Sequence, residues 1–355
     1  MPSETRKCVL WSVAFGLLIV LAIWSAGCSS SSIAGPNPGG GGGGGGGGGT
    51  PTVALWIADG LNRQLLGFTP NQIQTSGSPA AFVTISAVSN GAGITVPQSM
   101  TFDSAGDMWV SNTSSSFPLV MFQPVQLTTG GPQGAFIAIG TDGLGDLVDP
   151  HGIVFDSSQN LWVAVPGKNL LLAYAPSQVT VSGNPLANIV IGTNILDAPN
   201  ALAFDGSGNL WVANSGNNQL LEFAASQITQ TGNPFPVVQI QSFALSNPSG
   251  LAFDSSGNLW VTNSVSPNSN GTIVEFTAAQ LATSGGIAPT FTLNEGSGTQ
   301  PYALVFDSGQ NLWVSNLAAK SVVEFTSTQL QGNGSTTPSL ILQGNFQPNA
   351  IVFQP

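Results

Sequence analysis

Short apolar runs, each bounded by turn residues, recur along residues 51–355 with a nearly fixed period. The clearest copy is Pro-Ser-Gly-Leu-Ala-Phe-Asp-Ser-Ser-Gly-Asn-Leu-Trp-Val-Thr-Asn, over residues 248–263. The tryptophans of the copies are separated by 53, 53, 49, 49 and 53 residues, and they are Trp56, Trp109, Trp162, Trp211, Trp260 and Trp313. Short apolar runs between turns are typical of buried β-strands, and self-similarity at this period indicates a repeat architecture.

Each repeat predicts four short strands, which we name a, b, c and d. In the fourth repeat they cover residues 249–253, 258–262, 272–276 and 289–293. Strands a and b are linked by Asp-Ser-Ser-Gly-Asn, a tight-turn sequence, because Asp bonds its own backbone while Gly and Asn accept positive φ. Between c and d a Gln recurs, as in Pro70-Asn-Gln72, and the Pro predicts one helical turn there.

The count of strands predicts how the repeats close. The last strand a begins at Asn349 and the chain ends at Pro355, with no b, c or d to follow. Residues 53–58, 64–68 and 81–85 are a b, a c and a d with no preceding a. We therefore predict an all-β fold, a six-bladed β-propeller of four-stranded antiparallel blades, closed by one blade shared between the N- and C-termini.

The repeated phrase resembles the NHL repeat and its relatives among six-bladed propellers. Pro150-His151-Gly152-Ile153 is similar to the strand starts of virginiamycin B lyases, and Pro199-Asn200-Ala201-Leu202 resembles the Asn motif of gluconolactonases. These resemblances imply metal-dependent chemistry near the channel mouth. The chain departs from both families, since Val165 and Asn214 stand where they carry Glu and Asp.

Residues 1–28 have the pattern of an export signal. Arg6 and Lys7 precede an apolar stretch, and Ser25-Ala-Gly-Cys28 resembles the bacterial lipobox, which implies that Cys28 carries lipid. An uncleaved membrane anchor is the alternative. Residues 29–50, which contain eleven consecutive glycines, are expected to form a disordered tether. We expect an exported lipoprotein anchored in a membrane, at the outer membrane or cell surface rather than the inner membrane.

Charge excludes one class of partner. Charged residues make up 6% of the chain, and beyond residue 28 there are three cations against fifteen carboxylates. A phosphate backbone needs clustered Lys and Arg, so nucleic-acid binding is excluded. The two cysteines, Cys8 and Cys28, both lie in the signal region, so the propeller has no disulfide.

Several residues that recur in the repeats are expected to be structural. We predict that the six tryptophans pack between blades. The aspartates that follow the repeated Phe are expected to cap turns, and they are Asp103, Asp156, Asp205, Asp254 and Asp307. Residues at the end of strand b are expected to hold a neighbouring loop, and they are Asp59, Asn112, Asn214, Asn263 and Asn316.

The residue after the recurrent Pro of strand a varies between repeats, and these residues are the candidate ligand-binding ring. They are Gln98, His151, Asn200, Ser249, Tyr302 and Asn349. A polar ring at the channel mouth suits a small polar or carbohydrate ligand. The alternative is that these side chains bind only channel water.

A second candidate site is a metal site at Asp146, Asp149 and His151. Carboxylate oxygens suit calcium or magnesium, and the histidine could complete a transition-metal site. The alternative is a solvated acidic loop.

The supply of catalytic groups favours binding over catalysis. His151 is the only histidine, and no cysteine follows residue 28. We therefore expect no nucleophile that is paired with a base. We expect a non-catalytic module for a glycan, peptide or protein partner, with no required cofactor. The alternatives are a metal-dependent lactonase or virginiamycin B lyase-like enzyme around His151, and a surface filler with no ligand.

Overall fold

The computed structural model describes residues 52–88, 92–113, 116–265, 270–332, 334 and 336–355. The expected signal segment 1–28, its Cys28 and the expected tether 29–50 lie outside the described residues. The described residues all belong to one compact unit. None of the helices in the described part of the chain has the length and apolar character needed to cross a bilayer.

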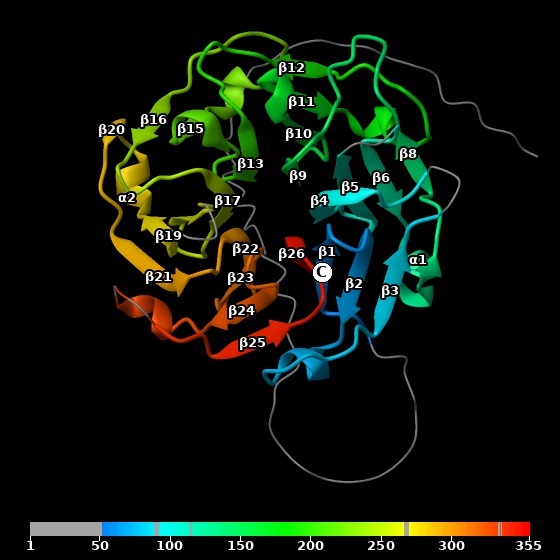
Figure 1. The fold of residues 1–355 in the computed structure, drawn as a ribbon. Coiled ribbons are helices and arrows are strands. Elements are labelled where there is room, and N and C mark those ends of the chain that lie inside the picture. Colours follow the sequence, from blue (N-terminus) through cyan, green and yellow to red (C-terminus); the bar gives the residue numbers. More distant parts are fainter. Residues whose placement is uncertain (1–51, 89–91, 114–115, 266–269, 333, 335) are drawn as a thin grey trace, which may run out of the picture. The chain divides into compact units, whose positions relative to one another are not determined.

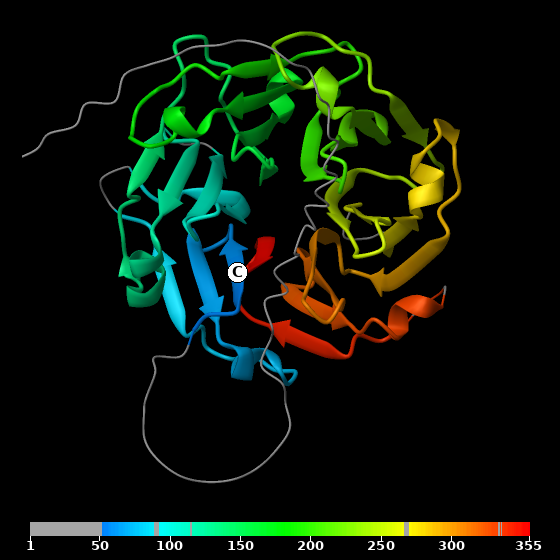
Figure 2. The same ribbon diagram turned by 180° about the vertical axis from the view of Figure 1, so that it is seen from behind.

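Six sheets stand in a ring, as Figure 1 shows from one side and Figure 2 from the other. From the centre outward, the first blade contains β26 (Pro348–Phe353), β1 (Leu55–Asp59), β2 (Gln64–Phe68) and β3 (Val83–Ser86). The second blade contains β4 (Val96–Phe102), β5 (Met108–Thr113), β6 (Leu119–Phe122) and β8 (Ile137–Ile139). The third blade contains β9 (Ile153–Phe155), β10 (Leu161–Val165), β11 (Leu170–Tyr174) and β12 (Ile189–Ile191).

The other three blades repeat this order. The fourth blade contains β13 (Pro199–Phe204), β14 (Leu210–Asn214), β15 (Gln219–Phe223) and β16 (Val238–Gln241). The fifth blade contains β17 (Pro248–Phe253), β18 (Leu259–Asn263), β19 (Asn270–Phe276) and β21 (Phe291–Ser297). The sixth blade contains β22 (Pro301–Phe306), β23 (Leu312–Asn316), β24 (Ser321–Phe325) and β25 (Leu340–Gln343). The all-β, six-bladed, four-stranded fold is therefore as predicted. In the first blade β26 pairs antiparallel with β1, so this sheet contains strands from both ends of the described chain.

The strand boundaries differ from prediction by a few residues. Strand d of the fourth repeat was expected to end at Leu293, but β21 continues to Ser297 because β19 begins early and Asn270 pairs with Ser297. Strand β9 begins at Ile153, two residues after His151. The N–H of His151 still donates to the carbonyl of Ala164 at 2.9 Å, so the hairpin extends to the channel mouth.

A helical turn lies between the third and fourth strands of every blade, as predicted. These turns are η1 (Pro70–Ile73), α1 (Pro124–Thr129), η3 (Pro176–Gln178), η5 (Ala225–Gln227), α2 (Ala278–Leu281) and η6 (Gln329–Gln331). Two further helical turns, η2 (Pro166–Lys168) and η4 (Ser215–Asn217), lie between the second and third strands of their blades. The recurrent Gln bridges each connection. In η3, Oε1 of Gln178 accepts from the N–H of Ala175 at 2.8 Å, and its Nε2 donates to the carbonyl of Leu186 at 2.7 Å.

Glycine segments cover the outer edge of every blade. Each fourth strand forms a parallel bridge with a glycine of the next blade, including β7 (Gly131–Pro132) and β20 (Gly285–Gly286); the pairs are Ile85 with Gly131, Ile139 with Gly183, Ile191 with Gly232, Ile240 with Gly285, Leu293 with Gly334 and Leu342 with Gly77. Exposed strand edges invite pairing with other chains. The glycine bridges occupy these edges and link neighbouring blades.

The core lies between blades, and the tryptophans pack there as predicted. Trp109 meets Phe155 of the next blade edge to face, with ring centroids 6.3 Å apart. The turn aspartates also act as predicted: Oδ1 of Asp103 accepts from the N–H groups of Ala105 and Asp107 at 2.9 and 3.0 Å. A further bond was not predicted, because Oδ2 of Asp103 accepts from Nε1 of Trp109 at 3.2 Å. Each aspartate thus joins its turn to the interblade core.

Candidate ligand-binding site

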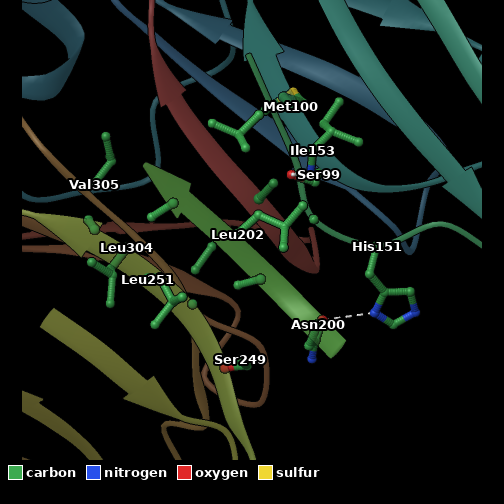
Figure 3. A pocket seen from close by; sticks show the side chains of 18 of the residues that line it. Ser99, Met100, His151, Ile153, Asn200, Leu202, Ser249, Leu251, Leu304 and Val305 are labelled. Atoms are coloured by element: carbon green, nitrogen blue, oxygen red, sulfur yellow. Dashed lines mark hydrogen bonds between the residues drawn. The ribbon is translucent and has the colours of Figure 1, made fainter. Parts of the chain in front are cut away.

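One cavity at the centre of the ring brings the six predicted ring residues together. It has a volume of about 400 Å³ and is lined by the first strands of all six blades. The lining includes Gln98, His151, Asn200, Ser249, Tyr302 and Asn349. This volume lies within the range of small-molecule sites. Figure 3 shows His151, Asn200 and Ser249 at one end of it.

Two of the ring residues are tied to the backbone. Ser249 is buried, and its Oγ donates to the carbonyl of Tyr302 at 2.9 Å. Asn349 is also buried, and its Nδ2 donates to the carbonyl of Pro97 at 2.9 Å. Both side chains therefore join the first strand of one blade to that of the next. Their hydrogen-bonding capacity is largely used within the protein.

Three other ring residues form a connected group. Nδ1 of His151 lies 2.9 Å from Oδ1 of Asn200, as Figure 3 shows. The hydroxyl of Tyr302 lies 3.5 Å from the same oxygen, at the outer limit of a hydrogen bond. Asn200 and Tyr302 come from blades that are not adjacent, so the tyrosine reaches past the blade of Ser249. These contacts gather the polar groups to one side of the ring.

Burial shifts the titration of both ionisable members of this group. It lowers the pKa of His151, while the hydrogen bond to Asn200 and the charge of Asp149 oppose that shift. Burial also raises the pKa of Tyr302, against the bond to Asn200. Both shifts favour the uncharged form. At neutral pH the group therefore presents a neutral imidazole and a neutral phenol.

Aliphatic side chains lie behind the polar ring, two residues further along each first strand. Their exposed fractions are 5–9%, and they are Met100, Ile153, Leu202, Leu251, Leu304 and Ile351. Figure 3 shows several of them bordering the cavity. Polar side-chain recognition is therefore concentrated at the ring.

In the acidic loop that precedes His151, the Asp142 carboxylate is used by hydrogen bonds within the loop. Asp142 is buried, and its Oδ1 accepts from the N–H groups of Leu144 and Asp146 at 3.1 and 3.0 Å. Asp149 is exposed and has positive φ, 43°. Across the described residues no three His, Cys, Asp or Glu side chains are grouped so that they could hold a metal ion, and this includes Asp146, Asp149 and His151. The metal site at Asp146, Asp149 and His151 stays a prediction.

The residues that end strand b hold the loop that enters the same blade. Asn214 accepts from the N–H of Asp197 at 2.8 Å and donates to the carbonyl of Ile195 at 2.8 Å. Asn112 and Asn263 make the equivalent bonds. Asn316 differs, because its Nδ2 donates to Oε2 of Glu295 at 2.6 Å and its Oδ1 has no partner. Nothing in the repeat pattern distinguished Asn316 from its counterparts.

Neither a protein-family model nor a curated protein sequence matches the chain. The fold is similar to the crystal structure of a nidogen/laminin complex, with a TM-score of 0.58 and 16% identity over 86% of this chain and 99% of that chain. It is similar to a streptogramin B lyase structure, with a TM-score of 0.54 and 12% identity over 85% of this chain and 87% of that one.

A putative 6-phosphogluconolactonase from Bacteroides fragilis is also similar, with a TM-score of 0.53 and 12% identity over 82% of this chain and 79% of that one. One scaffold can carry unrelated activities, so similarity at this level of identity describes architecture. The chain therefore shares its fold with six-bladed β-propeller proteins.

Proposed function

We propose that the protein is an exported, lipid-anchored propeller of the NHL-repeat type that binds a ligand or partner at its channel mouth and carries out no catalysis. One observation carries the binding part: a single cavity collects the six polar residues that follow the recurrent Pro, at the position that varies between repeats. The rest of each repeat serves packing, turns and edges. A site is expected where the repeat varies on a constant scaffold.

The chemistry of the lining supports binding over catalysis. The cavity contains one imidazole, and no Asp, Glu, Lys or Arg is among its lining residues. Acid–base catalysis needs a positioned proton donor and acceptor. His151 could serve as a base, but no carboxylate borders the cavity to act beside it. Hydrogen-bonding groups without a charged partner suit recognition.

Export and lipid attachment rest on the sequence of residues 1–50. The test is metabolic labelling of the full chain with an alkyne fatty acid in a bacterial host. We expect the label on the wild type and its loss in Cys28→Ser. Label on the variant, or none on the wild type, contradicts the lipid anchor and favours the uncleaved segment.

A metal-dependent lactonase or virginiamycin B lyase-like enzyme is the second candidate. The Pro150-His151-Gly152-Ile153 motif places His151 on the cavity, and the fold is similar to that of a streptogramin B lyase. This candidate requires a divalent ion near His151. It therefore predicts stabilisation by calcium, magnesium or manganese that His151→Ala removes.

The test of binding is thermal unfolding of the full chain in phospholipid nanodiscs, with a panel of oligosaccharides, peptides and divalent metals. A ligand of the native state at a hundred times its Kd adds about 2.7 kcal/mol to the free energy of unfolding. We expect one organic probe to raise the Tm of the wild type. Asn200→Ala should abolish that shift.

Ser249→Ala is the matched control, since Ser249 belongs to the same ring but is bonded to the backbone. We expect it to lower the Tm without removing the response to the probe. A metal response that depends on His151 would replace the binding module by the enzyme. No response to any probe would leave a filler without a ligand.

A further inference from the structure

The hydrogen bond to Asn200 sets the tautomer of His151. An amide oxygen can only accept, so Nδ1 of His151, 2.9 Å from Oδ1 of Asn200, carries the proton. In the neutral ring Nε2 then holds a lone pair. No described residue makes a hydrogen bond to Nε2, and Figure 3 shows this nitrogen on the far side of the ring from Asn200. His151 therefore offers an acceptor to a ligand.

Asn200 offers the complementary donor. Both His151 and Tyr302 contact its Oδ1, so neither uses the two hydrogens on Nδ2. These hydrogens can be donated to a ligand. No described residue accepts from Nδ2, and Figure 3 shows the amide nitrogen pointing away from His151. An acceptor and a donor on neighbouring blades thus border one cavity.

The lining also excludes charged groups. A buried charge needs an opposite charge or several strong hydrogen bonds. The cavity has no Lys or Arg to balance an anion and no Asp or Glu to balance a cation. Burial also lowers the pKa of His151, so the imidazole provides no positive charge at neutral pH.

We propose that the cavity selects an uncharged carbohydrate, with one hydroxyl donating to Nε2 of His151 and a sugar oxygen accepting from Nδ2 of Asn200. This inference rests on the proposed binding function and adds the class of ligand. A hydroxyl both donates and accepts, so one hydroxyl or two adjacent ones can satisfy both groups. The C–H groups of the sugar ring then lie against the apolar side chains behind the ring of polar residues.

The experiment compares hexasaccharides of different charge on the full chain in nanodiscs. The neutral probes are maltohexaose, cellohexaose and chitohexaose; the anionic probe is hexagalacturonate and the cationic probe is the glucosamine hexamer. We expect at least one neutral probe to bind, and the charged probes to bind at least tenfold more weakly or not at all. Empty nanodiscs correct for binding to lipid.

Two variants of His151 test the acceptor. His151→Gln keeps an acceptor oxygen and should bind the neutral probe within a few-fold of the wild type. His151→Leu has none and should bind about tenfold more weakly, the usual effect of a lost hydrogen bond. Circular dichroism and the Tm of each variant verify that it is folded.

The outcomes separate this inference from the proposed function. Tighter binding of a charged probe, or of a peptide from the thermal-unfolding panel, overturns the assignment of an uncharged carbohydrate. Equal binding of the neutral probe by wild type and His151→Leu overturns the proposed contact with Nε2. If that binding is still lost in Asn200→Ala, the channel-mouth binding function stands. If no oligosaccharide or peptide binds the wild type, both fall.

Discussion

Asn316 donates a hydrogen bond to Glu295 at 2.6 Å, and both partners are left with an unsatisfied buried oxygen. These atoms are Oε1 of Glu295 and Oδ1 of Asn316. Burial raises the pKa of Glu295 to about 7, although the bond from Asn316 favours the ionised form. A proton on the carboxyl group turns one of its oxygens from an acceptor into a donor. The protonated acid is therefore the form that this pocket accommodates.

The first prediction follows from this pair and concerns pH. The unfolded chain releases the Glu295 proton near 4.5, whereas the native protein holds it to about 7. Glu295 thus stabilises the fold fully below pH 4.5, and this contribution is lost as pH rises through about 7. The loss amounts to about 3 kcal/mol.

Glu295→Gln should remove that dependence, because its amide can donate without titrating. Urea denaturation between pH 4 and 9 measures the difference between variant and wild type. We expect the variant to be more stable at pH 8, with an advantage that shrinks towards pH 5. A variant that is destabilised equally at every pH would show that Glu295 is ionised in the native protein.

The second prediction concerns Tyr174, whose buried hydroxyl has no partner. The five other blades have Phe at this position, opposite the first residue of strand b; they are Phe68, Phe122, Phe223, Phe276 and Phe325. Tyr174→Phe should therefore raise the free energy of unfolding by about 1–2 kcal/mol. The matched control is Tyr302→Phe, which removes a bonded hydroxyl and should give no gain. A loss of stability in Tyr174→Phe would mean that the hydroxyl has a partner, such as bound water.

The third prediction concerns the turn aspartates. Asp254 accepts from the N–H of Ser256, from the N–H and Nδ2 of Asn258, each at 2.9 Å, and from Nε1 of Trp260 at 3.1 Å. Asp254→Ala should lower stability by about 2–4 kcal/mol, since four donors lose their acceptor. Ser255→Ala in the same turn removes no such acceptor and should stay within about 0.5 kcal/mol of the wild type. Similar losses in both variants would contradict the role of the carboxylate.

The fourth prediction concerns His151, whose pKa is lowered from 6.5 mainly by burial. As pH falls below 6.5 the unfolded chain takes up a proton before the native protein does, so stability declines through the lowered pKa. His151→Gln should flatten this part of the profile, and the difference between variant and wild type should grow below pH 6.5. The same protonation removes the acceptor at Nε2, so a neutral sugar should also bind more weakly once the pH falls below the lowered pKa of His151 than it does at pH 8. Sugar binding that stays unchanged at a pH where the stability difference shows His151 to be protonated would contradict contact with that nitrogen.

The repeat pattern alone determined the blade count, the strand order, the packing role of the tryptophans and the turn role of the aspartates. Each of these recurs at the same step of every repeat. The turn role of the aspartates rests on hydrogen bonds within a few residues, and the packing of the tryptophans follows from a large apolar side chain at the same position of every blade. The position of the six ring residues was also predictable, because the same step of the repeat places each at the start of a first strand. The hydrogen-bond partners of the six were not predictable: two bond to the backbone, three form one group, and Gln98 donates to Thr113 at 3.5 Å.

Tertiary structure decided that Ser249 and Asn349 bond to the backbone while His151, Asn200 and Tyr302 form one group. The reach of Tyr302 to Asn200 joins positions 102 residues apart. Only the packing of the blades around the cavity sets that distance and the direction of each side chain. For the same reason the unsatisfied oxygens of Glu295 and Asn316 could not be read from a sequence in which both residues look ordinary.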